Sequence, residues 1–177
     1  MPEERTLSTR WVFQGRAIRL RVDEVALPSG RHTQREIVEA RGAVGIVALD
    51  DEGGLLLVRQ FRKPAERELW EIPAGTLEPG EPPLECARRE LAEETGYRAE
   101  EFTPMASFYT SPGFCDEVVH LFLARGLTEV GQALEEDEML SVLKVPMGRA
   151  LEMIRTGEIA DAKTIAGILL LGQMEEA

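Results

Sequence analysis

The sequence predicts an α/β protein, an α/β/α sandwich with a mixed sheet, preceded by a separate N-terminal antiparallel sheet. Strand-like segments precede, flank and follow one central helical segment, two further helical segments end the chain, and the first forty residues alternate in the manner of strands. With 177 residues and 44% hydrophobic residues, the chain can bury one full core. We expect a strand-rich segment at residues 1–40 and the main domain at 41–177.

Residues 10–38 are predicted to form the N-terminal antiparallel sheet. Apolar residues recur with a period of two, and Pro28-Ser29-Gly30 marks a turn within the segment. A sheet this small cannot bury both of its faces by itself. It should therefore pack on the main domain or on a partner subunit.

Residues 43–49 and 55–61 are expected to form a hairpin around the turn at 50–54. Arg59 and Arg62 follow near its end, and a planar guanidinium can bind two diphosphate oxygens at once. An ordinary solvated strand end is the alternative for both arginines. Trp70, in the stretch that follows, is expected to belong to the core.

Residues 83–95 are predicted to form the central helix. Proline at 82 and 83 suits a first helical turn, and Gly96 can end the helix with a left-handed dihedral. Glu90, Glu93 and Glu94 then fall on an arc of about 100°. Like charges at this spacing destabilise a helix, and a hard divalent cation would compensate them.

Strands are expected at 102–109 and 118–124, joined by a rigid turn that contains Pro112-Gly113. Residues 126–137 are predicted to be a polar, acidic connection before a strand at 139–145. Helical periodicity returns at 147–155 and 161–174, and Asp161 can cap the last helix.

Composition and charge exclude several classes of protein. The net charge of −12 argues against a nucleic-acid surface, and no apolar run approaches the ~20 residues of a membrane span. Cys86 and Cys115 lack the spacing of a zinc site or a disulfide framework. The start of the chain has no signal-peptide pattern, so we expect a cytoplasmic protein.

The stretch from Gly75 to Tyr97 resembles the Nudix box, in which a glycine, five residues, a glutamate and seven residues precede R-E-U-x-E-E-x-G-U. Eight positions match, and only Tyr97 departs, where an aliphatic residue is more usual. The alternative is a solvated acidic helix face. The resemblance implies the Nudix fold and a metal-dependent hydrolase of a diphosphate.

The resemblance also implies roles for individual residues. Glu90, Glu94 and the main-chain carbonyl of Ala74 are expected to bind magnesium, or manganese or another divalent cation. Glu93 would assist in catalysis, and Arg89 would orient it. Box glutamates that hold metal are poor proton acceptors, so an acidic segment elsewhere should supply the base, with the candidates Glu136 and Glu138.

Pro112 stands sixteen residues beyond Gly96, which resembles the ADP-ribose pyrophosphatase subfamily. This likeness implies hydrolysis of ADP-ribose to AMP and ribose 5-phosphate, and a homodimer that exchanges its N-terminal segments. The residues expected to contact substrate are Arg59, Arg62, Glu71, Ser111, Pro112 and Gly113.

Two other functions stay open at this point. One is a hydrolase of another nucleotide sugar, such as GDP-mannose, with the same metal chemistry. The other is a nucleotide-sensing module that binds without turnover, against which the intact glutamates argue.

Overall fold

The computed structural model describes residues 3–132 and 140–175 and divides the chain into two compact units. The first unit consists of Met1–Gly42 and Tyr109–Val118, and the second of Ala43–Phe108 and Val119–Ala177. Each unit is described by itself below. None of the described helices is long and apolar enough to cross a membrane.

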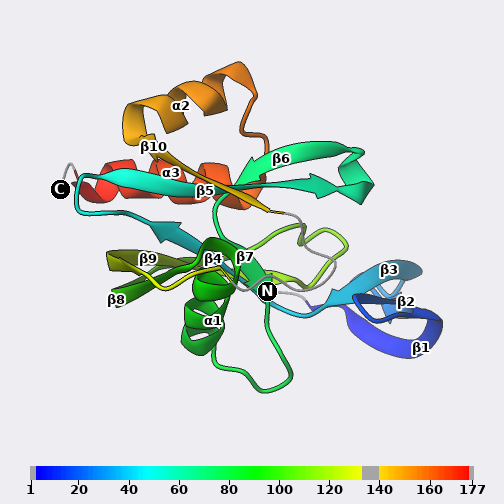
Figure 1. The fold of residues 1–177 in the computed structure, drawn as a ribbon. Helices are drawn as coiled ribbons and strands as arrows, with labels where there is room; N and C mark the ends of the chain where they lie inside the picture. Colours follow the sequence, from blue (N-terminus) through cyan, green and yellow to red (C-terminus); the bar gives the residue numbers. More distant parts are fainter. Residues whose placement is uncertain (1–2, 133–139, 176–177) are drawn as a thin grey trace. The chain divides into compact units, whose positions relative to one another are not determined.

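The first unit is built on a three-stranded antiparallel sheet, ordered β1-β2-β3 (Figure 1). Its strands are β1 (Arg5–Gln14), β2 (Ile18–Ala26) and β3 (His32–Ala40). The turn between β2 and β3 contains Gly30 at φ +83°, a left-handed conformation that glycine adopts without steric cost. The expected N-terminal sheet is thus present, and it begins at Arg5 rather than near residue 10.

The second unit contains two sheets. The antiparallel one has the order β10-β5-β6, and the mixed one has the order β7-β4-β9-β8, in which β4 and β9 are parallel. Their strands are β4 (Ala43–Ala48), β5 (Gly54–Arg62), β6 (Arg67–Glu71), β7 (Ala74–Thr76), β8 (Tyr97–Tyr109), β9 (Val118–Glu129) and β10 (Ser141–Pro146). A short 3₁₀ turn, Lys63–Ala65, joins β5 to β6.

Three helices complete the second unit, and the first and third of them cover opposite faces of β4 (Figure 1). They are α1 (Pro83–Thr95), α2 (Met147–Thr156) and α3 (Ala162–Glu175). Val44 and Ile46 pack in one core with Leu91 of α1, whereas Val47 packs in a second core with Ile168 of α3. The predicted α/β/α sandwich with a mixed sheet is therefore confirmed.

The expected hairpin of residues 43–61 is wrong. A turn does lie at 50–54, where the Asp50 carboxylate accepts hydrogen bonds from the backbone of Glu52 and Gly54 at 3.0 and 2.7 Å. The strands on either side join different sheets, however, and only an isolated bridge links Leu49 to Leu55. Local turn residues determine the chain reversal, but long-range packing selects the partners of strands buried on both faces.

Two strand boundaries also differ from expectation. The strand that follows α1 begins at Tyr97 instead of Phe102, and β9 continues to Glu129 through part of the predicted polar connection. Polar residues are accommodated there because the added residues of both strands are exposed or half-buried. The strand expected from Met139 is seen from Ser141, and Met139 lies outside the described residues.

Candidate active site

Helix α1 presents the three box carboxylates with different degrees of burial. The helix spans Pro83–Thr95 as predicted, and Gly96 ends it at φ +75°. The side chains of Glu90 and Glu93 are 12% and 39% exposed, and Glu94 is 4% exposed. Burial of a carboxylate requires polar partners or a cation, so Glu90 and Glu94 are the two whose surroundings matter most.

The strand before the helix fits closely against these two carboxylates. The backbone N–H of Ala74 donates a hydrogen bond to Oε2 of Glu94 at 2.9 Å. At Gly75, a Cβ atom would lie 1.8 Å from Cδ of Glu90 and 2.0 Å from its Oε1. The box glycine is therefore required by space, because the side chain of Glu90 occupies the position that any larger residue would fill.

Arg89 pairs with three glutamates of the box, Glu81, Glu90 and Glu93. Its Nη1 contacts Glu90 at 2.7 Å and Glu93 at 3.1 Å. Its Nε and Nη2 donate to the two oxygens of Glu81 at 3.0 and 3.1 Å. The expected pair with Glu93 is present, and the contacts with Glu81 and Glu90 add to it. These contacts raise the pKa of Arg89, led by the hydrogen bonds to Glu81.

Glu81 anchors the loop between Gly75 and the helix. It accepts the bidentate contact from Arg89, and its Oε2 also accepts a hydrogen bond from the backbone of Glu78 at 2.9 Å. These interactions, first of all those with Arg89, lower the pKa of Glu81 to about 2. Glu81 therefore links the loop to helix α1.

The donor set suits a divalent cation that keeps water and substrate ligands. Among the described residues, no three Asp, Glu, His or Cys side chains form a ready-made metal cage. Magnesium, however, is usually held by one or two carboxylates together with waters and substrate phosphates. Glu90 and Glu94 are two carboxylates on adjacent turns of α1, and Ala74 lies beside Glu94, so this donor set fits such a cation.

Glu71, one of the expected substrate contacts, is 1% exposed and forms an internal ion-pair cluster. Arg62 donates to its two oxygens at 2.8 and 2.7 Å, and Nζ of Lys163 lies 2.5 Å from Oε2. Burial by itself would raise the pKa of Glu71, but the hydrogen bond from Arg62 and the charge of Lys163 outweigh it and lower the pKa. Arg62 and Glu71 thus pair with each other.

A second contact from α3 was not foreseen from the sequence. Oγ1 of Thr164 accepts a hydrogen bond from the backbone N–H of Ile72 at 2.9 Å and donates one to Asp161 at 2.6 Å. The backbone N–H of Thr164 also donates to Asp161, which confirms the predicted cap. One feature of the sequence indicates that Lys163 has an acidic partner. Lys163 lies in the first turn of α3, where the helix dipole disfavours a cation.

Arg59 has partners of its own within the second unit. Its guanidinium forms an ion pair with Glu68 at 2.5 Å and lies 5.5 Å from the centre of the Trp70 ring. Trp70 packs against the core that contains α3, as expected. A role for Arg59 in substrate binding stays a prediction.

Ser111, Pro112 and Gly113 belong to the first unit. The carbonyl of Ser111 accepts hydrogen bonds from the backbone of Phe114 and Cys115, which closes the expected turn. Pro112 and Gly113 line a pocket of about 450 Å³, and Tyr109 and Phe114 beside them are 60% and 58% exposed. The turn thus carries two large aromatic side chains at the surface of this unit.

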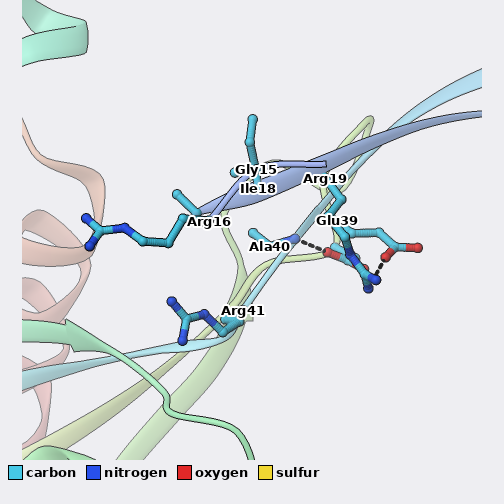
Figure 2. Close-up of a pocket in the computed structure, with 9 residues that line it drawn as sticks. Gly15, Arg16, Ile18, Arg19, Glu39, Ala40 and Arg41 are labelled. Carbon is cyan, nitrogen blue, oxygen red and sulfur yellow. Dashed lines mark hydrogen bonds and ion pairs between the residues drawn. The ribbon is translucent and has the colours of Figure 1, made fainter. Parts of the chain in front are cut away.

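A second pocket of the first unit, of about 300 Å³, is rich in arginine (Figure 2). Arg19 pairs with Glu39 at 2.6 Å, and the backbone N–H of Ala40 donates to Asp116 at 2.9 Å. Figure 2 shows the guanidinium groups of Arg16 and Arg41 extending in the same direction. Neither forms an ion pair with any described residue, so both can bind an anion.

The two candidate bases, Glu136 and Glu138, lie outside the described residues. Their roles stay predictions. The neighbouring Gln132 is described, and its side-chain amide donates a hydrogen bond to the backbone carbonyl of Glu94 at 2.5 Å. Gln132, the last described residue before this acidic segment, therefore lies at the C-terminal end of helix α1.

Comparison with known families gives two matches along the chain. Residues 39–166 match the family described as NUDIX domain. Residues 4–38 match the family described as nucleoside diphosphate sugar hydrolase N-terminal domain.

Several curated proteins are similar over nearly the whole chain. An "ADP-ribose pyrophosphatase" of Bacillus subtilis is 49% identical over 99% of this chain and 95% of its own length. A "Methanol dehydrogenase activator" of Bacillus methanolicus is 45% identical over the same shares. An "ADP-ribose pyrophosphatase" of Mycobacterium tuberculosis is 42% identical over 93% of this chain and 81% of its own. "GDP-mannose pyrophosphatase" of Salmonella choleraesuis is 36% identical over 82% of this chain and 78% of its own.

A solved structure shares the fold. The protein titled "Crystal structure of ADP compounds hydrolase" superposes with a TM-score of 0.87 and covers 99% of this chain and 94% of that one. Its sequence identity is 22%, so the likeness concerns the fold alone.

Proposed function

This chain belongs to the Nudix family, and we propose that it hydrolyses the pyrophosphate bond of ADP-ribose to AMP and ribose 5-phosphate. The observation that carries the proposal is an intact box in a chain 49% and 42% identical, over most of its length, to proteins named ADP-ribose pyrophosphatase. Nudix hydrolases generally need a divalent cation, and the carboxylates on α1 suit one.

We propose magnesium as the cation, held by Glu90, Glu94 and the carbonyl of Ala74. When bound, such a cation neutralises phosphate charge and makes a coordinated water more acidic. The protein's part is to hold the two carboxylates in place, which the fit of Glu90 against Gly75 and the Ala74 hydrogen bond support. Arg89 fixes the side chain of Glu93 from the same helix.

The proton acceptor is proposed to be Glu136 or Glu138. A carboxylate that holds a cation is a poor base, so one outside the box suits the task better. Glutamine at each position, and at both together, should slow the chemical step. Unchanged single-turnover rates in all three variants would remove this part of the proposal.

Selectivity for ADP-ribose is proposed to depend on the turn at Ser111-Pro112-Gly113. The carboxylates of α1 interact with cation and phosphate and cannot distinguish one nucleotide sugar from another. A rigid turn with fixed backbone groups can do so, because a substrate without matching groups leaves polar atoms unpaired at about 1–3 kcal/mol each.

Catalytic efficiency with four substrates tests the proposal. With purified protein and magnesium, we expect ADP-ribose to exceed ADP-glucose, GDP-mannose and NADH by at least about tenfold in kcat/KM, or ~1.4 kcal/mol. GDP-mannose is the second candidate, because proteins named GDP-mannose pyrophosphatase are 36% identical to this chain. A lead for GDP-mannose or NADH would keep the Nudix chemistry and overturn the ADP-ribose assignment.

We also propose a homodimer in which residues 1–40 cross to the partner and contribute to its nucleotide pocket. Every residue of β1 is exposed within one chain, including the large side chains of Trp11, Val12 and Phe13. Arg16 and Arg41, which form no ion pair within the described part of the chain, would then bind phosphate of the partner's substrate. A fully active monomer in light scattering at dilute concentration would end this proposal.

A cytoplasmic location is part of the proposal. Both cysteines, Cys86 and Cys115, are free thiols, which suits a reducing compartment.

A further inference from the structure

The segment from Glu71 to Gly75 contacts a helix at each of its ends, α3 at the start and α1 at the other end. At the start, two successive residues contact the first turn of α3: the carboxylate of Glu71 binds Lys163, and the N–H of Ile72 donates to Thr164. Both Glu71 and Thr164 are almost completely buried, with 1% and 0% exposure. Two consecutive buried contacts of this kind hold in place the end of β6 and the start of the link to β7.

The other end of the segment contacts the carboxylates of α1. Ala74 donates its N–H to Glu94 at 2.9 Å, and the absent Cβ of Gly75 leaves the space that Glu90 occupies. Ala74 also pairs with Gly45, and its neighbour Pro73 accepts a hydrogen bond from the N–H of Ile46. A shift of this strand would therefore move the surface against which both carboxylates rest.

We propose that Lys163 and Thr164 are positioning residues, which hold Glu90 and Glu94 in their cation-binding arrangement through the segment 71–75. The inference rests on the proposed function in that it takes these two glutamates as the cation ligands. Lys163 and Thr164 contact Glu71 and Ile72, which lie at the start of this segment. Both residues follow the box by more than sixty residues in sequence, and both hold the end of the segment opposite to Ala74 and Gly75.

The alternative is that both residues only stabilise the core. Two features favour positioning. A buried ion pair is costly to desolvate and is often no more stabilising than apolar residues of the same size, so Lys163 and Glu71 are poor choices for stability alone. In addition, the contacts are made by adjacent residues, Glu71 and Ile72, only two residues before Ala74.

The test measures Mn²⁺ binding by electron paramagnetic resonance, without substrate, and kinetics with substrate. Thr164→Val keeps the shape of the side chain but removes the hydroxyl, and Thr164→Ser restores it. Lys163→Gln removes the charge, and Lys163→Arg restores it. Thr156→Val is the matched control, because the hydroxyl of Thr156 is also hydrogen-bonded, but to Glu152 and Glu158 around the end of α2.

We expect Thr164→Val and Lys163→Gln to weaken Mn²⁺ binding by about tenfold, the lower end of what loss of a ligand-orienting partner costs. The kcat should fall by a similar factor with KM for ADP-ribose little changed. Thr164→Ser, Lys163→Arg and Thr156→Val should bind Mn²⁺ like the wild type. If Thr164→Val fails to fold, the variants Lys163→Gln and Lys163→Arg test the inference by themselves.

Wild-type Mn²⁺ affinity in folded Thr164→Val and Lys163→Gln would overturn the inference, as would an equal loss in Thr156→Val. A lower melting temperature with unchanged Mn²⁺ affinity would assign both residues to stability alone. The proposed function has a separate test. A wild-type chain that binds Mn²⁺ but releases no AMP from ADP-ribose would remove that function, and the affinities of the variants would still test positioning.

Discussion

Replacing Gly75 with alanine should disable the site without unfolding the protein. The added Cβ would lie 1.8 Å from Cδ of Glu90, whereas an ordinary contact begins at 3.4 Å, so the carboxylate has to move by 1.6 Å. Because the obstructing atoms belong to the end of a flexible side chain, the fold can accommodate the methyl group. The carboxylate cannot keep its place, and a displacement of about 1 Å in a catalytic group can cost 10²-fold in rate.

The assay is AMP release from ADP-ribose at saturating magnesium, with thermal unfolding followed in parallel. We expect kcat of Gly75→Ala to fall by about a hundredfold or more. Gly148→Ala is the matched control, since a Cβ at Gly148 meets nothing within 4 Å and the residue lies in helix α2. That variant should keep full activity and gain up to about 1 kcal/mol of stability. Wild-type kcat in Gly75→Ala would refute the steric reasoning.

Two further predictions concern the charges of α1 and its loop. Glu90→Gln and Glu94→Gln should each lower turnover by orders of magnitude while the circular dichroism spectrum stays native, and Glu93→Gln should be damaging to a lesser degree; near-normal rates in the first two variants would remove the metal assignment. The pKa of Glu81 is about 2 in the folded protein against 4.5 for an ordinary glutamate, so its pairing with Arg89 stabilises the fold above pH 4.5 and is lost as the pH falls toward 2. As the pH falls from 4.5 toward 2, the free energy of unfolding in urea should decrease by about 1–2 kcal/mol less in Glu81→Gln than in the wild type; the figure is this small because solvent screens part of the pair. Parallel pH profiles of the two proteins would contradict this prediction.

Local signals were sufficient to predict the helix that carries the box. Proline at 82 and 83 and glycine at 96 act within one turn of the helix, and the bounds expected from them agree with the structure. The spacing of Glu90, Glu93 and Glu94 likewise needs no information from the rest of the chain. Features that depend on neighbours in sequence can be derived from the sequence.

Features that depend on distant partners could not be derived in this way. The turn at 50–54 predicts a hairpin for the strand before it. The parallel partner of that strand, β9, begins at residue 118, too far along the chain for turn residues to indicate the pairing. A second example is the internal ion pair of Glu71, whose expected contact with substrate stays a prediction. Its partner Lys163 lies 92 residues away, so the internal ion pair could not be recognised from spacing.

The parallel pairing of β4 with β9 has a consequence for synthesis of the protein. Ala43 pairs with Val119, so the ribosome must add 76 residues after the first residue of β4 before its central partner can begin to form. At translation rates of about 5–20 residues per second, the wait lasts roughly 4–15 s. During this time the apolar run from Val44 to Ala48, which is completely buried in the folded protein, remains available to other nascent chains. Slower elongation after β4 would therefore lower the yield of native protein through aggregation, and chaperones that bind extended apolar segments would restore it.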